Sequence, residues 1–241
     1  MILADLHVHS TFSDGQMTIA ELVDFYGSRG FGAIAITDHL CETNALIGKA
    51  ARIIGHTLTE HTFSIYLRTL EEQRERAWKQ YRMVLIGGVE ITQNRISNHR
   101  SAHILGLGIE KWINPNGDVV DIAKSIQAQG GLAIAAHPVS TRKIEKQTYH
   151  LWDRRKELRH VLDGWEVASG RHWFDEVAKE KLPVIATSDL HRADQIDSWK
   201  TVFTCEKHPE AILTAIRRQD IDFHYYLPVS LSTQVLSHAH R

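Results

Sequence analysis

Apolar residues along the chain are concentrated in short runs that alternate with amphipathic stretches. Residues 2–9 and 33–37 are extended apolar runs, and between them Thr18 and Glu21 form a capping box that opens an amphipathic stretch ending near residue 30. This order predicts a strand, a helix and a parallel second strand buried on both faces. Further strands are predicted at residues 84–89, 103–108, 132–136, 165–168 and 184–187, with helices at 119–129 and 174–181. The fold class is therefore α/β throughout.

One segment interrupts this alternation. Residues 40–83 are longer than an ordinary connection between a strand and a helix, and their second part, 63–82, has the charge pattern of a surface helix. The first part either covers a site or packs on the outside without a functional role, and the sequence leaves both interpretations open. Because no linker, low-complexity tract or repeat divides the chain, we expect one domain over residues 1–241 with an excursion at 40–83.

Composition and charge narrow the classes of function. The chain has 241 residues, 43% of them hydrophobic, and a formal net charge of −1. It lacks the basic surface of a protein that binds long duplex DNA, the apolar run of a membrane span and the start of a secretory signal. The two cysteines, Cys41 and Cys205, suit a reducing compartment. We therefore expect a cytoplasmic protein that acts on small or short substrates.

Histidine is the compositional outlier, with 16 residues in 241. The carboxyl ends of strands in a parallel α/β sheet or barrel meet on one face, and many polar residues of this chain stand at such ends. They are His7, His9, Asp14, Asp38, His39, Glu90, His137, Asp189 and His191, and His103 joins them from the start of the strand that follows Glu90. Each is a weak signal alone, but together they predict one polar cluster on that face.

Imidazole and carboxylate groups without thiolates suit Zn, Mn or Fe better than a cysteine-rich structural zinc site. Acid and base catalysis without a metal would need only one or two histidines and a carboxylate. So many polar groups on one rim without cations would leave several of them unpaired, at about 1–3 kcal/mol each. The cluster therefore predicts bound divalent metal ions.

The motifs DLHVHS, SDG, ITDH, GVEIT, SAHILGLG, AAHP and TSDLH occur in this order along the chain. They resemble the motifs of the polymerase and histidinol phosphatase (PHP) family of metal-dependent phosphoesterases, over about three-quarters of the chain from His7 to His191. The resemblance implies a distorted (β/α)7 barrel of the TIM-like type. It also implies two or three divalent ions, Mn, Zn or Fe, and hydrolysis of a phosphate monoester or diester.

The same resemblance implies a ligand set. His7, His9, Glu90 and Asp189 would bind one ion, Asp14, His39 and His137 a second, and Glu90, His103 and His191 a third. Asp14 stands where some members of the family carry histidine, and it still offers an oxygen ligand. Asp38 is expected outside this set, as a partner that orients a histidine.

Bound ions would supply an activated water for attack on phosphorus, so Glu90 and Asp189 are expected to act in catalysis through them. The cationic residues that follow the motif strands are Arg142, Arg171 and Arg192. They are candidates for binding the phosphate, with Arg192 preferred, and a solvated surface charge is an equally good interpretation of the other two. His172 is either a proton donor to the leaving group or an ordinary surface histidine.

Three alternative functions stay open at this point. A proofreading-type nuclease would add a basic groove with stacking aromatic side chains. An amide hydrolase could use the same activated water, and a regulatory domain could bind metal without turnover. The expected partner is a small phosphate ester or a short nucleic acid, with neither a membrane nor stably bound duplex DNA.

Overall fold

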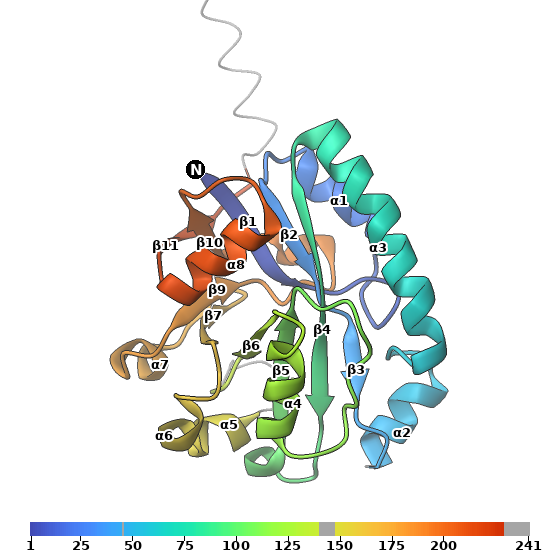
Figure 1. Cartoon of the computed structure of the whole chain (residues 1–241), viewed down its shortest axis with the longest axis vertical. Coiled ribbons are helices and arrows are strands. Elements are labelled where there is room, and N and C mark those ends of the chain that lie inside the picture. The colour runs from blue at the N-terminus through green and yellow to red at the C-terminus, as the bar shows by residue number, and fades with distance from the viewer. Residues whose placement is uncertain (45, 140–147, 229–241) are drawn as a thin grey trace, which may run out of the picture.

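The computed structural model describes residues 1–44, 46–139 and 148–228 (Figure 1). The strands are β1 (Ile2–Val8), β2 (Ala33–Ile36), β3 (His39–Cys41), β4 (Val84–Gln93), β5 (Ala102–Leu107), β6 (Leu132–Ala135), β7 (Gly164–Ser169), β8 (His172–Trp173), β9 (Val184–Thr187), β10 (Ser198–Phe203) and β11 (Ile221–Tyr226). The α-helices are α1 (Ile19–Gly27), α2 (Leu46–Ile53), α3 (Glu60–Tyr81), α4 (Val119–Gln127), α5 (Tyr149–Asp153), α6 (Arg155–Leu158), α7 (Asp175–Lys179) and α8 (Pro209–Arg218), with 3-10 turns at Asn98–Arg100 and Ala193–Ile196.

The strands of the described ranges form a single curled sheet in the order β11-β10-β1-β2-β4-β5-β6-β7-β8, with β3 paired to β4 and β9 paired to β7. Strands β1, β2 and β4 are parallel, as are β6, β7 and β9, whereas β5 is antiparallel to both its neighbours. A parallel bridge joins Val8 to Leu190, and the His9 amide donates to the Leu190 carbonyl at 2.9 Å. The end of β1 therefore contacts the segment that follows β9, which curls the sheet round on itself.

The predicted α/β class is confirmed, and every predicted strand is present. The regular seven-unit barrel stays a prediction, because β5 reverses direction and β10 and β11 add an antiparallel edge that the sequence did not indicate. None of the helices in the described ranges is both long and apolar enough to cross a membrane.

Helix α1 begins where the capping box predicts it. The Thr18 hydroxyl accepts from the Glu21 amide, and the Glu21 carboxylate accepts from the Thr18 amide at 2.8 Å, so two otherwise unpaired amides at the helix start are satisfied. Leu22, Val23 and Tyr26 of this helix are buried in the large apolar cluster that packs α1, α3 and α4 on the sheet. Burial of this stripe fixes the helix beside β1.

The excursion at 40–83 contains β3 and two helices of different character. Helix α3 is the predicted surface helix, and it packs on α1 and β4 with Phe63, Tyr66 and Leu70 buried. Helix α2 lies beside β3, on the side of the molecule where that strand ends (Figure 1). The excursion thus adds one helix to the outer layer and places another near the carboxyl ends of the strands.

A buried polar network ties three elements to β1. The Asp5 carboxylate accepts hydrogen bonds from the Tyr26 hydroxyl at 2.8 Å and from the amide and hydroxyl of Ser188 at 3.0 and 2.6 Å. Lys200 of β10 pairs with the same carboxylate at 3.1 Å, and both side chains are fully buried. The network holds α1, the end of β9 and β10 against the strand that carries His7.

We predict that Lys200→Ala lowers the free energy of unfolding by about 3–5 kcal/mol, because it leaves a buried carboxylate without its cationic partner. Urea denaturation followed by circular dichroism measures the change. The control is Lys207→Ala, an exposed lysine that donates to the Arg82 carbonyl, which should change the value by less than about 0.5 kcal/mol. Equal effects of the two variants would contradict the role given to the ion pair.

Candidate metal centre

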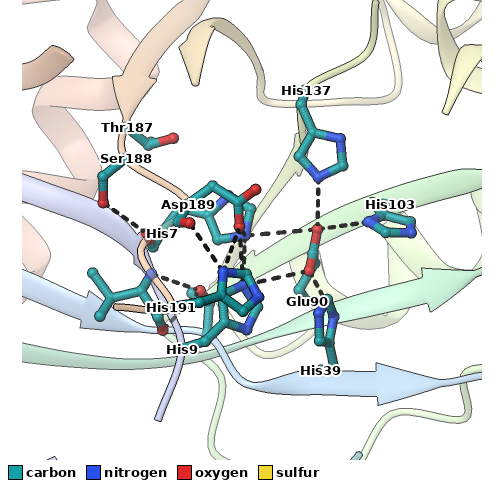
Figure 2. Close-up of polar contacts among 12 residues, drawn as sticks. His7, His9, His39, Glu90, His103, His137, Thr187, Ser188, Asp189 and His191 are labelled. Carbon is teal, nitrogen blue, oxygen red and sulfur yellow. Dashed lines mark hydrogen bonds and ion pairs between the residues drawn. The ribbon is translucent and has the colours of Figure 1, made fainter. Parts of the chain in front are cut away.

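All nine residues predicted to bind metal lie together at one edge of the sheet, and Figure 2 labels all of them except Asp14. They come from positions far apart in the sequence: from the end of β1 and the turn after it, from β3, β4 and β5, and from the segments that follow β6 and β9. They are His7, His9, Asp14, His39, Glu90, His103, His137, Asp189 and His191. The carboxyl ends of the parallel strands share that side of the sheet, and the antiparallel strand β5 brings His103 there from its amino end.

Glu90 stands at the middle of the cluster and is fully buried. Its Oε1 atom lies 2.9 Å from His103 Nδ1 and 3.2 Å from His137 Nε2. Its Oε2 atom lies 2.7 Å from His39 Nδ1 and 3.6 Å from His9 Nε2. Four imidazoles therefore surround one carboxylate (Figure 2), so Glu90 is placed to bridge two or more ions.

The ligand atoms fall into three groups, each within 4.8 Å: His9, Asp14, His39 and His191; His7, His9 and Glu90; and Glu90, His103 and His137. Asp189 Oδ1 lies 3.4 Å from His7 Nε2 and 3.3 Å from His9 Nε2, which adds it to the second group.

This grouping differs in two respects from the assignment that the resemblance implies. His9 belongs to two of the groups instead of one. His191 lies with Asp14, and His137 lies with Glu90 and His103, so the two histidines exchange places. Both follow a strand, and the sequence offers no measure of which neighbouring group each ring reaches. The exchange depends on the order of strands around the sheet, which is a tertiary property.

The spacing of these atoms fits shared cations. Ligand atoms that bind one ion at about 2.1 Å lie about 3.0–3.5 Å apart. His7 Nε2 and His9 Nε2 are 3.0 Å apart, and Asp14 Oδ1 is 3.2 Å from His191 Nε2 and 3.5 Å from His39 Nε2. The donor set present thus has the separations that divalent ions require.

Several of the clustered atoms are buried without a hydrogen bond among the described residues. They are His9 Nδ1, Asp14 Oδ1 and Glu90 Oε2. Glu90 Oε2 and Asp14 Oδ1 face imidazole nitrogens of His39 at 2.7 Å and of His191 at 3.2 Å, without the geometry of a hydrogen bond. A buried polar atom without a hydrogen bond costs about 1–3 kcal/mol, and native proteins contain few of them. Metal coordination satisfies these atoms, so the residues present fit divalent ions.

The protonation states of Glu90 and His9 also suit metal binding. Burial opposes the ionised form of Glu90, but His103 and His39 outweigh it and hold the pKa of Glu90 well below its usual range. Burial, together with His191 and His39, lowers the pKa of His9 to about 3. An ionised carboxylate and a neutral imidazole are the forms in which these side chains bind metal.

The pKa of His191 is shifted in the opposite direction to that of His9. Burial opposes its protonation, yet Asp14 and Asp189 raise the pKa of His191 to about 9. At neutral pH the ring therefore carries a proton that an ion must displace.

Glu166 of β7 is a buried functional residue that the sequence analysis missed. Its Oε1 atom lies 2.8 Å from His7 Nδ1 and accepts from the Thr187 hydroxyl at 2.6 Å, while Oε2 accepts from the His137 amide at 2.6 Å. Burial lowers the pKa of His7, but Glu166, Asp189 and Glu90 outweigh it and hold that pKa well above its usual range. The contact with Glu166 keeps a proton on Nδ1, and an ion bound at Nε2 would displace a second proton. A glutamate within the apolar run Trp165–Ala168 was the signal available in the sequence.

Two of the nine residues have left-handed backbone conformations that side-chain-bearing residues seldom adopt. His137 has φ of 27° and Asp189 has φ of 54°. Such conformations persist where the surrounding structure enforces them, and they concentrate at functional sites. Here the Glu166 carboxylate holds the His137 amide, and the Asp189 carbonyl lies 3.0 Å from His191 Nδ1.

Asp38 was expected to orient a histidine, and its hydrogen bonds show a different role. Its carboxylate accepts from the Ser10 amide and hydroxyl at 2.8 and 2.6 Å and from the Ser13 hydroxyl at 2.6 Å. These bonds shape the turn that follows β1. Asp38 therefore positions the loop that carries Asp14.

A cavity of about 570 Å³ opens over the cluster, and Arg192 lines it together with ligand residues from all three groups. Arg192 is about half exposed, and its ion pair within the described residues is with Asp194, at 3.2 Å. An exposed pair of this kind is weak, so the guanidinium is available to an anion in the cavity.

The other candidates for binding phosphate lie differently. Arg171 pairs with Asp197 at 2.8 Å and is 64% exposed, and neither it nor His172 of β8 is among the described residues that line the cavity. Arg142 lies outside the described residues. The structure thus brings Arg192 to the cluster and leaves Arg171 and His172 outside the cavity.

Comparison with known proteins gives the family. The family model of the PHP domain matches residues 5–156, well over half of the chain. The chain belongs to the PHP domain family. The match covers the motifs from DLHVHS to AAHP and therefore seven of the nine clustered residues.

Individual proteins are similar to this chain in sequence or in fold. A phosphoribosyl 1,2-cyclic phosphate 1,2-diphosphodiesterase of Eggerthella lenta is 31% identical over 110 residues, which are 46% of this chain and 32% of that protein. A two-domain protein of Bacteroides vulgatus, containing a predicted PHP-like metal-dependent phosphoesterase, has a TM-score of 0.70 at 24% identity, covering 93% of this chain and 65% of that chain. PsfC of Pseudomonas syringae has a TM-score of 0.59 at 13% identity, covering 99% and 96%. The chain spans about a third of the curated relative and about two-thirds of the two-domain protein.

We predict that Glu166→Gln weakens metal binding about 10- to 100-fold, because the amide no longer fixes the tautomer of His7. Titration of the metal-free protein with Mn²⁺ or Zn²⁺, followed by calorimetry, measures the affinity without relying on turnover. Glu176→Gln, on the exposed surface of α7, is the matched control and should bind metal as the unchanged protein does. An affinity retained in Glu166→Gln would reduce this residue to a structural role.

Proposed function

We propose that this chain is a metal-dependent phosphoric ester hydrolase that uses two or three divalent ions, Mn, Zn or Fe. The observation that carries the proposal is the buried Glu90 carboxylate, which has imidazoles around both oxygens and one oxygen without a hydrogen bond. Membership in the PHP family and the phosphodiesterase activity of the Eggerthella lenta relative support phosphate esters as the substrate. The nine clustered residues are the proposed ligands.

The bound ions would supply an activated water and charge to draw electrons from the phosphoryl oxygens. Other residues of the chain hold the metal-binding side chains and Arg192 in place. Glu166 fixes the ring of His7, so the Nε2 atom of that ring keeps one direction. Gln195 accepts from the amides of His191 and Arg192 at 2.6 and 2.7 Å, which holds the loop that carries Arg192.

Arg192 is the proposed phosphate-binding residue. It lines the cavity that contains the ligand side chains, and guanidinium matches phosphoryl oxygens in charge and shape. This cation at the rim favours a phosphate ester over an amide, whose neutral carbonyl has no need of it. The substrate that we propose is a small phosphate ester or a short nucleic acid.

Phosphate release tests the proposed function. Protein loaded with Mn²⁺ should release inorganic phosphate from at least one of a panel of sugar phosphates, nucleotides and cyclic phosphodiesters, the last assayed with an added phosphatase. Chelator should abolish the release, and His9→Ala should lower kcat at least about 1000-fold because it removes a proposed ligand of two groups. Shortening of oligonucleotides alone would indicate a nuclease, and bound metal without any hydrolysis would contradict the proposal.

Arg192→Ala should raise KM for the best substrate of that panel about tenfold, because one charge-assisted hydrogen bond to the phosphoryl group is lost. Steady-state kinetics at a fixed Mn²⁺ concentration measures the change. Arg68→Ala, on the exposed face of α3, removes the same charge elsewhere and should leave KM unaltered. An unchanged KM in Arg192→Ala would show that Arg192 is a solvated surface charge that does not bind the phosphate.

A further inference from the structure

The cavity over the metal centre has two chemically different walls. Polar and cationic side chains, from Gln16, Arg192 and Gln195, form one of them. Residues of α2 and of the turn after it form the other, and they are Ala50, Ala51, Ile54 and His56. The second wall is therefore apolar over most of its length, beside a floor of imidazoles and carboxylates.

Close packing on β3 holds this apolar wall in place. At Gly48, in the middle of α2, an added Cβ would lie 1.7 Å from the carbonyl oxygen of Glu42, which directly follows β3. Only glycine allows the helix to come this near. The approach sets α2 beside β3 (Figure 1). Ala50, Ala51 and the adjoining Ile54 line the cavity.

Ile53 and Ile54, at the end of α2, differ in their position relative to the cavity. Ile54 lines the cavity and is 63% exposed, whereas Ile53 is 85% exposed and is absent from the lining residues described. A large aliphatic side chain facing a ligand cavity gains free energy when an apolar group covers it. A purely polar ligand would leave that surface in water.

We propose that Ala50, Ala51 and Ile54 form a subsite for an apolar or aromatic group that the substrate carries on its ester oxygen. The phosphoryl group then lies on the proposed metal ligands and against Arg192, and the attached group lies on the α2 wall. This inference rests on the proposed function and narrows its substrates to aryl or nucleoside-like phosphate esters. The cavity, at about 570 Å³, has the size of a site for one small molecule.

Binding of two phosphonates tests the subsite without requiring turnover. Benzylphosphonate carries a methylene group in place of the ester oxygen of phenyl phosphate, and methylphosphonate lacks the ring. Calorimetry on the full chain loaded with Mn²⁺ gives the two dissociation constants, for the unchanged protein, for Ile54→Ala and for Ile53→Ala. Both substituted positions are exposed, so the fold should be retained.

The unchanged protein should bind benzylphosphonate at least about tenfold more tightly than methylphosphonate. Ile54→Ala should lower this ratio about fivefold or more, while Ile53→Ala should keep it, because only Ile54 lines the cavity. Equal affinities in the unchanged protein, a ratio preserved in Ile54→Ala, or no binding of either phosphonate would overturn the subsite.

Phosphate release from phenyl phosphate and methyl phosphate, measured in parallel, separates the two proposals. A binding preference that Ile54→Ala removes, with no turnover of any ester, would contradict the hydrolase and leave the subsite supported. Turnover of both esters without a binding preference would contradict the subsite and leave the hydrolase supported.

Discussion

The rest of the structure depends on one arrangement, in which the buried Glu90 carboxylate is surrounded by imidazole rings whose nitrogen atoms face it. Glu90 is fully buried, and His39, His103 and His137 lie within 3.2 Å of its oxygens. Desolvation of so many polar groups is unfavourable unless each one finds a partner. Cations meet that need for several atoms at once. The remaining parts of the fold serve to hold this arrangement before any ion binds.

A surrounding layer of carboxylates does most of that holding. Glu166 fixes His7 and the backbone of His137, so one side chain orients residues in two of the three groups. Asp38 shapes the turn that carries Asp14, and Asp5 joins β1 to its neighbours directly below His7. Ordered packing of this kind allows metal ligands to keep their geometry.

Most of the centre could be predicted from the sequence, because strand ends in parallel sheets converge on one side and the unusual residues stand at those ends. The grouping of His137 and His191 could not, since it depends on which strands become neighbours. Glu166 was missed because a single glutamate in an apolar run resembles an ordinary strand residue until its partners are known. The wall formed by Ile54 was hidden for a similar reason, because only the tertiary fold turns α2 toward the cavity.

The most direct test of the metal centre is anomalous diffraction from crystals of the metal-loaded protein, collected at the absorption edge of the bound element. The account predicts at least two peaks, each about 2.0–2.2 Å from ligand atoms, with Glu90 oxygens bound to two of the ions. It also predicts His191 beside the ion that Asp14 binds, and His137 beside the one that His103 binds. Absence of any peak within about 3 Å of the Glu90 carboxylate would contradict the account.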